Sequence, residues 1–253
     1  MSQVRAGNGL DRGSGLAAWG LGMAIGAVFL VLVLPPSTNC SGARAAQARN
    51  NLKQIGLALE AYHRDHGRFP PQAVYSPEGR PLYSWRVLIL PYLEQQALYD
   101  EFDLNAAWDG PHNRKLLARR PAVYDPVGLI VDTTLTFSQV FVGKGAAFEG
   151  RQGMALADFE DGPEHTLLVV EAGEPVPWTK PADVPYKPAA QLPTLGGVFK
   201  GGSGLFGFGG TDGCNVVFAD AGVRFIPRRE LADQAIAPLI TRGERESIDD
   251  FLK

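Results

Sequence analysis

Two histidines at the end of a predicted helix, His63 and His66, have the spacing of metal ligands. Residues three apart share a helix face, so both imidazoles could bind one transition metal, whereas Asp65 lies off that face. The same residues also suit a helix end, where cationic side chains interact favourably with the helix dipole. We favour this second interpretation and predict no metal. His112 and His165 stand alone and are interpreted as structural.

The densest group of carboxylates lies in the segment ADFEDGPEH, which contains Asp158, Glu160, Asp161 and Glu164. Calcium binds such oxygens, but the Asp-x-Asp-x-Asp-Gly order of a calcium loop is missing. Two carboxylates can also serve a glycosidase, yet nothing in the segment singles out a pair. A turn at Asp161-Gly162 that leads into a strand explains the group more simply.

No pattern of a nucleophilic or phosphate-binding enzyme is present. The glycine-rich stretch GGVFKGGSGLFGFGGTDG, residues 196–213, has neither the G-x-S-x-G elbow of a hydrolase nor the Gly-Lys-Ser/Thr ending of a phosphate loop. Trp178 and Tyr186, in the proline-rich segment 173–195, could stack on a sugar ring, or they could be packing residues. We therefore predict no enzyme and no cofactor, and retain Trp178 and Tyr186 as candidate ligand contacts.

Charge and cysteine content exclude further classes of protein. A net charge of −3 and a pI near 5.8, with no basic stripe, give no support for nucleic-acid binding. The two cysteines, Cys40 and Cys214, are too few for a disulfide framework and lack the spacing of a zinc site. We expect both thiols to be unpaired.

Residues 16–34, LAAWGLGMAIGAVFLVLVL, carry no charge and form the predicted membrane anchor. As a helix they would span about 28 Å, close to the hydrocarbon thickness of a bilayer. The alternative is a cleaved signal peptide, but no clear cleavage site follows. We predict an N-terminal segment at 1–15, a signal anchor at 16–34 and a domain at 41–253. Basic residues on both sides leave the orientation open.

The segment that follows the anchor, from about Ser41 to His66, is predicted to form an amphipathic helix. The apolar residues of this helix recur at steps of three and four, which places them on one face: Ala48, Leu52, Ile55, Leu59, Tyr62 and His66. Gly67 suits the C-cap, and Pro70-Pro71 prevents continuation. Such a face must pack against something, most simply the sheet of its own domain.

The rest of the chain predicts helices first and antiparallel strands later, which is typical of an α+β domain. The expected helices are Trp85–Leu90, capped by Ser84, then Tyr92–Phe102, Pro111–Arg119 and Arg229–Thr241. The expected strands are Leu135–Val142, His165–Glu171, Asn215–Phe218 and Val223–Ile226. ADAG would join the last two as a tight hairpin, with Gly222 supplying a positive φ.

Four segments together resemble the bacterial domain of unknown function 1559 family, also called solute-binding protein family 10. They are NNLKQIGLALEAYHRDHGRFPP, SWRVLILPYLEQQALYDEFDLNAAWDGPHNRKLLARRPAVY, LADFEDGPEHTLLVVEAGEPVPWTK and NVVFADAGVRFI. The resemblance runs from about Leu32 to Ile248. It implies a pseudopilin-like architecture of the type II secretion and type IV pilin class, in which a long helix packs on an antiparallel sheet.

The chain departs from this family at positions tied to assembly and to a disulfide. Gly20 stands where pilin-like members carry a glutamate, which puts processing and polymerisation in doubt. Gly210 occupies the position of a family histidine in the hairpin region. The family's cysteine before the Asn-Asn pair is missing at Ala48 and Arg49, and its usual partner is missing in VYDPVG, residues 123–128. Because both cysteines are missing together, the resemblance implies that they form a disulfide bond with each other in other family members.

The resemblance implies a single-pass envelope protein of the inner membrane, with a cytoplasmic N-terminus at 1–15 and its domain on the extracytoplasmic, periplasmic side. We expect a non-enzymatic role through assembly or protein contacts, with self-association or secretion- and pilus-type components as partners and no nucleic acid. The alternative is an extracytoplasmic ligand-binding module, with glycans as the candidate ligands, that uses the glycine-rich stretch and Trp178.

Overall fold

The structure is a computed structural model that describes residues 40–127, 132–188, 190–197, 213–232 and 236–243. Residues Ser41–Lys253 form one compact unit. The predicted anchor at 16–34 lies outside the described residues, as does most of the glycine-rich stretch. Among the helices that are described, none combines the length and the apolar character needed to cross a membrane.

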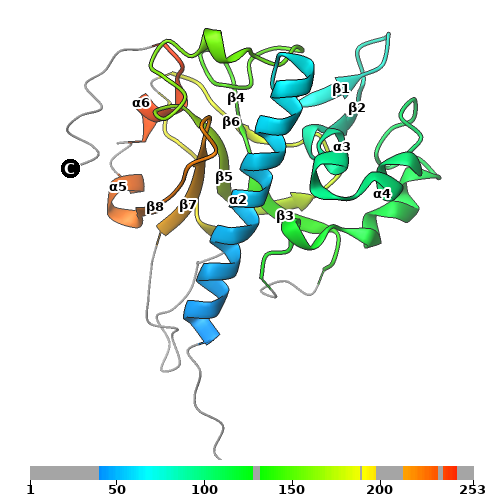
Figure 1. Ribbon diagram of the computed structural model, residues 1–253, viewed down its shortest axis with the longest axis horizontal. Coiled ribbons are helices and arrows are strands. Elements are labelled where there is room, and N and C mark those ends of the chain that lie inside the picture. The colour runs from blue at the N-terminus through cyan, green and yellow to red at the C-terminus, as the bar shows by residue number, and fades with distance from the viewer. Residues whose placement is uncertain (1–39, 128–131, 189, 198–212, 233–235, 244–253) are drawn as a thin grey trace, which may run out of the picture. The chain divides into compact units, whose positions relative to one another are not determined.

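Helix α2, Cys40–His66, is the longest described element, at 27 residues (Figure 1). Most of its predicted apolar face is buried, since Ala48, Leu52, Ile55 and Leu59 are each at most 4% exposed, whereas Tyr62 is half-buried and His66 is exposed near the end of the helix. Gly67 ends the helix with a φ of +70°, and its N–H donates to His63 O at 2.7 Å. The predicted glycine C-cap is confirmed.

Helix α2 packs on a four-stranded antiparallel sheet with the order β3-β5-β7-β8 (Figure 1). These strands are β3 (Leu135–Gln139), β5 (Leu167–Pro177), β7 (Gly213–Phe218) and β8 (Val223–Pro227). The predicted α+β class, with a long helix on an antiparallel sheet, is therefore confirmed. Strand β5 continues six residues beyond the predicted end at Glu171, to Pro177.

The helix approaches the sheet most closely at Gly56. A Cβ at this position would lie 2.8 Å from Cγ1 of Val217 and 3.2 Å from Cβ of Ala221. Nearby, Lys53 Nζ donates to Ala221 O at 2.9 Å and ties α2 to the hairpin. The missing side chain at Gly56 thus lets α2 lie directly against β7 and the β7–β8 turn.

Replacing Gly56 with valine is expected to destabilise the protein by about 1–3 kcal/mol, because the new side chain forces helix and sheet apart. Gln54→Val is the matched control, since it places the same β-branched residue on the exposed side of α2. Urea unfolding followed by circular dichroism measures both changes. Equal losses in the two variants would mean that helix propensity, rather than the close approach, determines the effect.

The β7–β8 turn differs from its prediction in one residue. The positive φ, +57°, belongs to Ala221, whereas Gly222 is not in the left-handed region. The Asp220 carboxylate accepts the N–H of Gly222 at 2.7 Å, and Ala221 N–H donates to Phe218 O at 2.9 Å. The Asp220 side chain thus fixes the turn one residue earlier than the glycine rule predicts.

The segment after α2 is divided into more and shorter elements than predicted. Ser84 caps α3 (Trp85–Leu88) as expected, accepting the N–H of Arg86 at 3.3 Å. The predicted helix Tyr92–Phe102 is wrong as a single element, because Glu94 adopts a φ of +58° and ends the preceding turn. The elements are β1 (Ala73–Tyr75), β2 (Pro81–Ser84), α3 (Trp85–Leu88), η1 (Leu90–Leu93), α4 (Gln96–Asp100), η2 (Asn113–Arg119) and η3 (Ala122–Tyr124).

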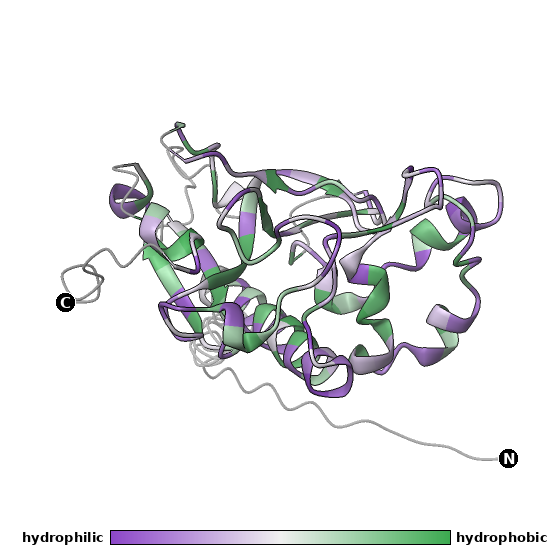
Figure 2. Cartoon of the chain, turned by 90° about the horizontal axis from the view of Figure 1, so that it is seen from above, coloured by the Kyte–Doolittle hydropathy of each residue, from purple (hydrophilic) through white to green (hydrophobic). Residues whose placement is uncertain are grey.

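The first predicted strand, Leu135–Val142, and the last predicted helix, Arg229–Thr241, are also interrupted. Val140 separates β3 from β4 (Phe141–Val142), which pairs in parallel with β6 (Val184–Pro185). The described parts of the predicted helix Arg229–Thr241 are α5 (Arg228–Ala232) and α6 (Ala237–Ile240), and η4 (Leu156–Asp158) lies between β4 and β5. Figure 2 shows apolar residues along the strands and polar residues on the outer loops.

Candidate functional site

The two candidate ligand contacts from the sequence lie in the core. Trp178 is 0% exposed, its Nε1 donates to Leu117 O at 2.9 Å, and its ring packs against Tyr124 and Phe102. Tyr186 is 7% exposed and belongs to a second apolar cluster on the sheet. Neither ring presents an open face on which a sugar could stack in this structure.

The histidines considered as metal ligands point to different partners. His63 Nε2 accepts the N–H of Leu156 at 3.2 Å, and burial lowers the pKa of His63, which favours the neutral acceptor form. His66 Nδ1 lies 2.9 Å from Tyr62 O, and its ring stacks on Tyr62 with 3.9 Å between centroids. Within the described ranges, no three His, Cys, Asp or Glu side chains gather as a metal site.

The acidic segment 157–165 forms a turn, as the simpler interpretation predicted. Gly162 has a φ of +91°, and its N–H donates to Phe159 O at 3.1 Å. Asp158 Oδ2 accepts the N–H of Ala155 at 2.8 Å, so this carboxylate fixes its own loop. Strand β5 begins five residues after the turn, at Leu167.

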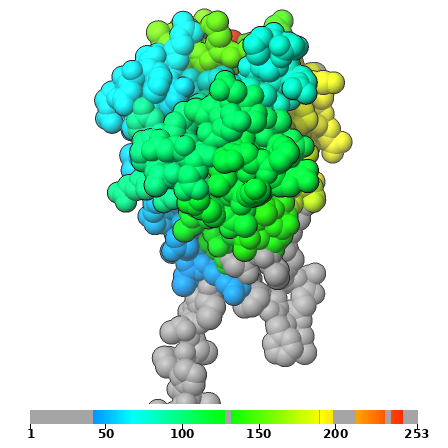
Figure 3. Space-filling view, turned by 90° about the vertical axis from the view of Figure 1, so that its right-hand side faces the viewer, coloured from blue at the N-terminus to red at the C-terminus, as the bar shows by residue number. Residues whose placement is uncertain are grey.

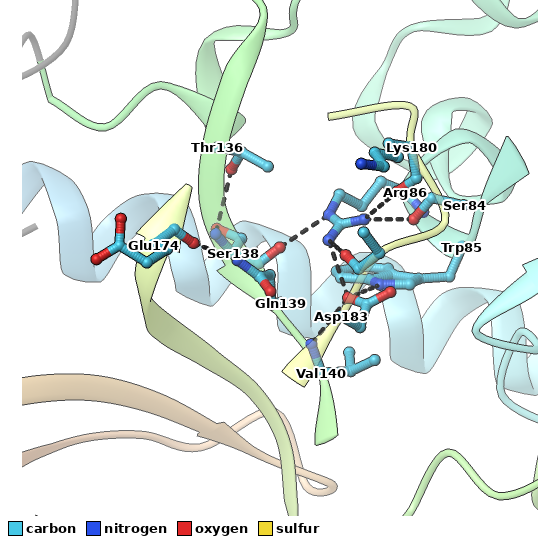
Figure 4. Close-up of polar contacts among 11 residues, drawn as sticks. Ser84, Trp85, Arg86, Thr136, Ser138, Gln139, Val140, Glu174, Lys180 and Asp183 are labelled. Carbon is cyan, nitrogen blue, oxygen red and sulfur yellow. Dashed lines mark hydrogen bonds and ion pairs between the residues drawn. The ribbon is translucent and has the colours of Figure 1, made fainter. Parts of the chain in front are cut away.

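A charged centre that the sequence did not reveal lies around Arg86, which is 0% exposed (Figure 4). Its guanidinium donates five hydrogen bonds, to Ser84 Oγ, Ser138 O, Lys180 O, Ala182 O and Asp183 Oδ1. A guanidinium has five N–H groups, so its donor capacity is used in full. The side chain joins α3 to strand β3 and to the proline-rich segment around Asp183.

Asp183 is the counter-ion of Arg86, with 2.9 Å between Oδ1 and Nη2 and no exposed side-chain surface on either residue. The same oxygen accepts Trp85 Nε1 at 3.2 Å and the N–H of Val140 at 3.1 Å. Burial raises the pKa of Asp183 to about 6, while the charge of Arg86 acts in the opposite direction. The guanidinium of Arg86 and the two N–H donors therefore stabilise the ionised form of this carboxylate, against the effect of burial.

This centre is enclosed by the protein, so we interpret it as structural. Tyr124, itself 1% exposed, covers it and donates from its hydroxyl to Arg86 O at 2.9 Å. In Figure 3 the segments between α3 and η3, coloured teal to green, cover this side of the protein. A charged pair without solvent contact holds segments together but cannot meet a substrate.

A second buried carboxyl, Glu171 in β5, borders a cavity of about 20 Å³. Glu171 is 3% exposed, and burial raises its pKa to about 7. Its Oε2 accepts the N–H and the Nδ2 of Asn215, at 2.8 and 3.0 Å. Cys214, a free and buried thiol as expected, donates to Glu171 O at 3.3 Å.

Three segments far apart in the sequence meet at this cavity. Its walls include Ala48 and Asn51 of α2, the turn 123–127, and Ser138 of β3. Ser138 is the cross-strand neighbour of Glu171. Val127 has a φ of +51°, which a β-branched residue rarely adopts. Ala48 and the turn are also the places where the family resemblance implied a lost disulfide, so these positions are neighbours in space.

Sequence reasoning missed Glu171 and Arg86 for different reasons. Glu171 could have been recognised from the sequence, since it is the single charged residue in the apolar run LLVVEAG and is therefore a carboxyl inside a predicted buried strand. Nothing in the sequence distinguishes Arg86, because a cationic side chain in a short helix is ordinarily solvated. The groups that accept hydrogen bonds from Arg86 lie up to 97 residues away in the chain.

Comparison with known proteins gives one match. The family SBP_bac_10, described as a protein of unknown function (DUF1559), matches residues 41–126, about a third of the chain, from α2 to the wall of the Glu171 cavity. No curated protein and no solved structure matches the chain. Residues 41–126 therefore match the SBP_bac_10 (DUF1559) family domain.

Proposed function

We propose that the protein is a membrane-anchored, non-enzymatic envelope protein of the pseudopilin-like kind, which acts through assembly or protein contacts. The observation that supports this most directly is the position of α2. It begins at Cys40, six residues after the apolar segment 16–34, and then packs along an antiparallel sheet. A helix that links an anchor to a sheet in this way has the plan of a pilin-like subunit.

The first turns of α2 are the part of the helix available for contacts with other subunits. Residues 42–47 are exposed or half-buried, whereas Ala48 and Leu52 are buried against the domain. In Figures 1 and 3 this blue end of the helix extends to the margin of the folded unit. Alanine at positions 43, 45 and 46 would let neighbouring helices approach closely.

The anchor is tested by fractionation of cells that express the full chain. We expect the protein to remain in the membrane pellet after carbonate extraction and to be degraded by protease added to spheroplasts, because the domain lies outside the cytoplasm. A variant that lacks residues 1–39 should move to the soluble fraction. Release of the full chain by carbonate, or protection from protease in intact spheroplasts, would contradict the proposal.

The assembly role is tested separately, by cysteine crosslinking in membranes in a Cys40→Ser background. Ala46→Cys, on the exposed start of α2, should crosslink to a second copy or to a neighbouring membrane protein. Lys115→Cys, exposed on η2 away from that helix end, is the control and should not. If Ala46→Cys gives no product and the full chain is monomeric in mild detergent, the assembly role is wrong.

A further inference from the structure

Among the residues that the structure describes, hydrogen-bond donors reach only one of the two carboxyl oxygens of Glu171. Both hydrogen bonds that it receives from described residues, from Asn215 N and Nδ2, end on Oε2. The side chain also lines the cavity between α2, the turn 123–127 and β3. Glu171 as a whole residue is 3% exposed, so its carboxyl group lies below the protein surface at the wall of this cavity.

The walls of this cavity supply oxygen atoms but no positive charge. No Lys, Arg or His is among the described residues that line it. Ser138 and Thr136 contribute hydroxyl groups, and the Ala122 and Asp125 carbonyls are held near α2 by Asn51 Nδ2, at 3.5 and 3.4 Å. The other acid of the wall, Asp125, is paired through Oδ2 with Arg120 at 3.1 Å.

We propose that this cavity binds a monovalent metal cation, Na⁺ or K⁺, with Glu171 as the charged ligand. A volume of about 20 Å³ suits an occupant of the size of one water molecule. Carboxylate, hydroxyl and carbonyl oxygens are the ligands that hard cations prefer. A buried charge is costly unless it is paired, and one carboxylate balances one positive charge.

The same charge balance argues against a divalent ion. Ca²⁺ or Mg²⁺ would leave one positive charge uncompensated in the interior, because Asp125 already has a partner in Arg120. The cation would connect α2, the turn 123–127 and the β3–β5 pair, whereas within the described residues the hydrogen bonds of Asn51 link α2 only to Ala122 and Asp125. Binding should therefore stabilise the folded domain in proportion to cation occupancy.

The test is thermal unfolding of the full chain in mild detergent at pH 8, in KCl, NaCl or choline chloride at equal ionic strength. At ten times the dissociation constant, Na⁺ or K⁺ should raise the Tm by about 3–5 °C relative to choline. CaCl₂ at the same ionic strength should give no comparable rise. The absence of a difference between the metal chlorides and choline would overturn the proposal, as would a response to Ca²⁺ alone.

Two glutamates of β5 provide a matched pair of variants. Glu171→Gln keeps the size and the hydrogen-bonding oxygen but removes the charge, so it should abolish the cation response. Glu174→Gln, three residues along the same strand and exposed, should retain it. A response that persists in Glu171→Gln would place the cation elsewhere. If that variant does not fold, Ser138→Ala replaces it, and an undiminished response there counts against the site.

Discussion

Replacing Arg86 with methionine is expected to lower the free energy of unfolding by about 3–5 kcal/mol, because Asp183 is left charged and buried without its counter-ion. Four oxygen acceptors besides Asp183 Oδ1 also lose a donor, at Ser84, Ser138, Lys180 and Ala182. Water cannot replace the guanidinium easily, since neither side chain of the ion pair has exposed surface. Urea unfolding of the full chain in mild detergent, followed by circular dichroism, measures the loss.

Two further variants separate charge from geometry at this site. Arg86→Lys keeps a positive charge but cannot reach five acceptors from three N–H groups, so its stability should fall between those of Arg86→Met and the wild type. Arg119→Met removes an arginine from the exposed pair with Glu101, whose side chains are 49% and 48% exposed, and should leave the unfolding midpoint nearly unchanged. If Arg86→Met proved as stable as Arg119→Met, the buried pair would not hold the fold.

Trp178→Ala is the second variant for which we expect a large effect, a loss of about 3–5 kcal/mol. The indole is 0% exposed, and its removal would leave a cavity between Phe102 and Tyr124 and an unpaired carbonyl at Leu117. Trp178→Phe retains most of the packing and loses the N–H donor, so its cost should be smaller. Unfolding curves for the two variants provide the comparison.

The matched control is Trp108, a half-buried indole that faces Lys180, with 5.9 Å from Nζ to the ring centroid. Trp108→Ala should cost clearly less than Trp178→Ala, because less of its surface leaves water on folding. A Trp178→Ala protein as stable as Trp108→Ala would place Trp178 outside the core. Loss of ligand binding in Trp178→Ala is therefore informative only in molecules shown to be folded.

The parts of the fold that were predictable are those determined by short-range patterns. The spacing of Leu52, Ile55 and Leu59 defined the buried face of α2, and Gly67 defined its end. The division of the segment after Ser84 into several short helices was not predictable in the same way. Glu94 has a positive φ that ends a helical turn, although glutamate as a residue type favours helix. The candidate site was largely hidden, since Arg86 and Asp183 pair across 97 positions of the chain.

Trp178 illustrates the converse error. Proline-rich segments are typical of surface loops, so a tryptophan in such a segment was interpreted as a candidate ligand contact. In the structure, the segment from Trp178 to Asp183 passes over the Arg86 centre, and long-range packing rather than local composition decides the exposure of its side chains.

The positions of the groups that accept hydrogen bonds from Arg86 also determine where the chain can be truncated without loss of the fold. The matched family region ends at residue 126, yet only Ser84, of the five groups that accept from the guanidinium, lies before that point. The sheet on which α2 packs also belongs entirely to later residues. Residues 41–126 are thus a unit of sequence similarity but not an autonomous folding unit, and a truncation at residue 126 would separate a buried cation from its counter-ion.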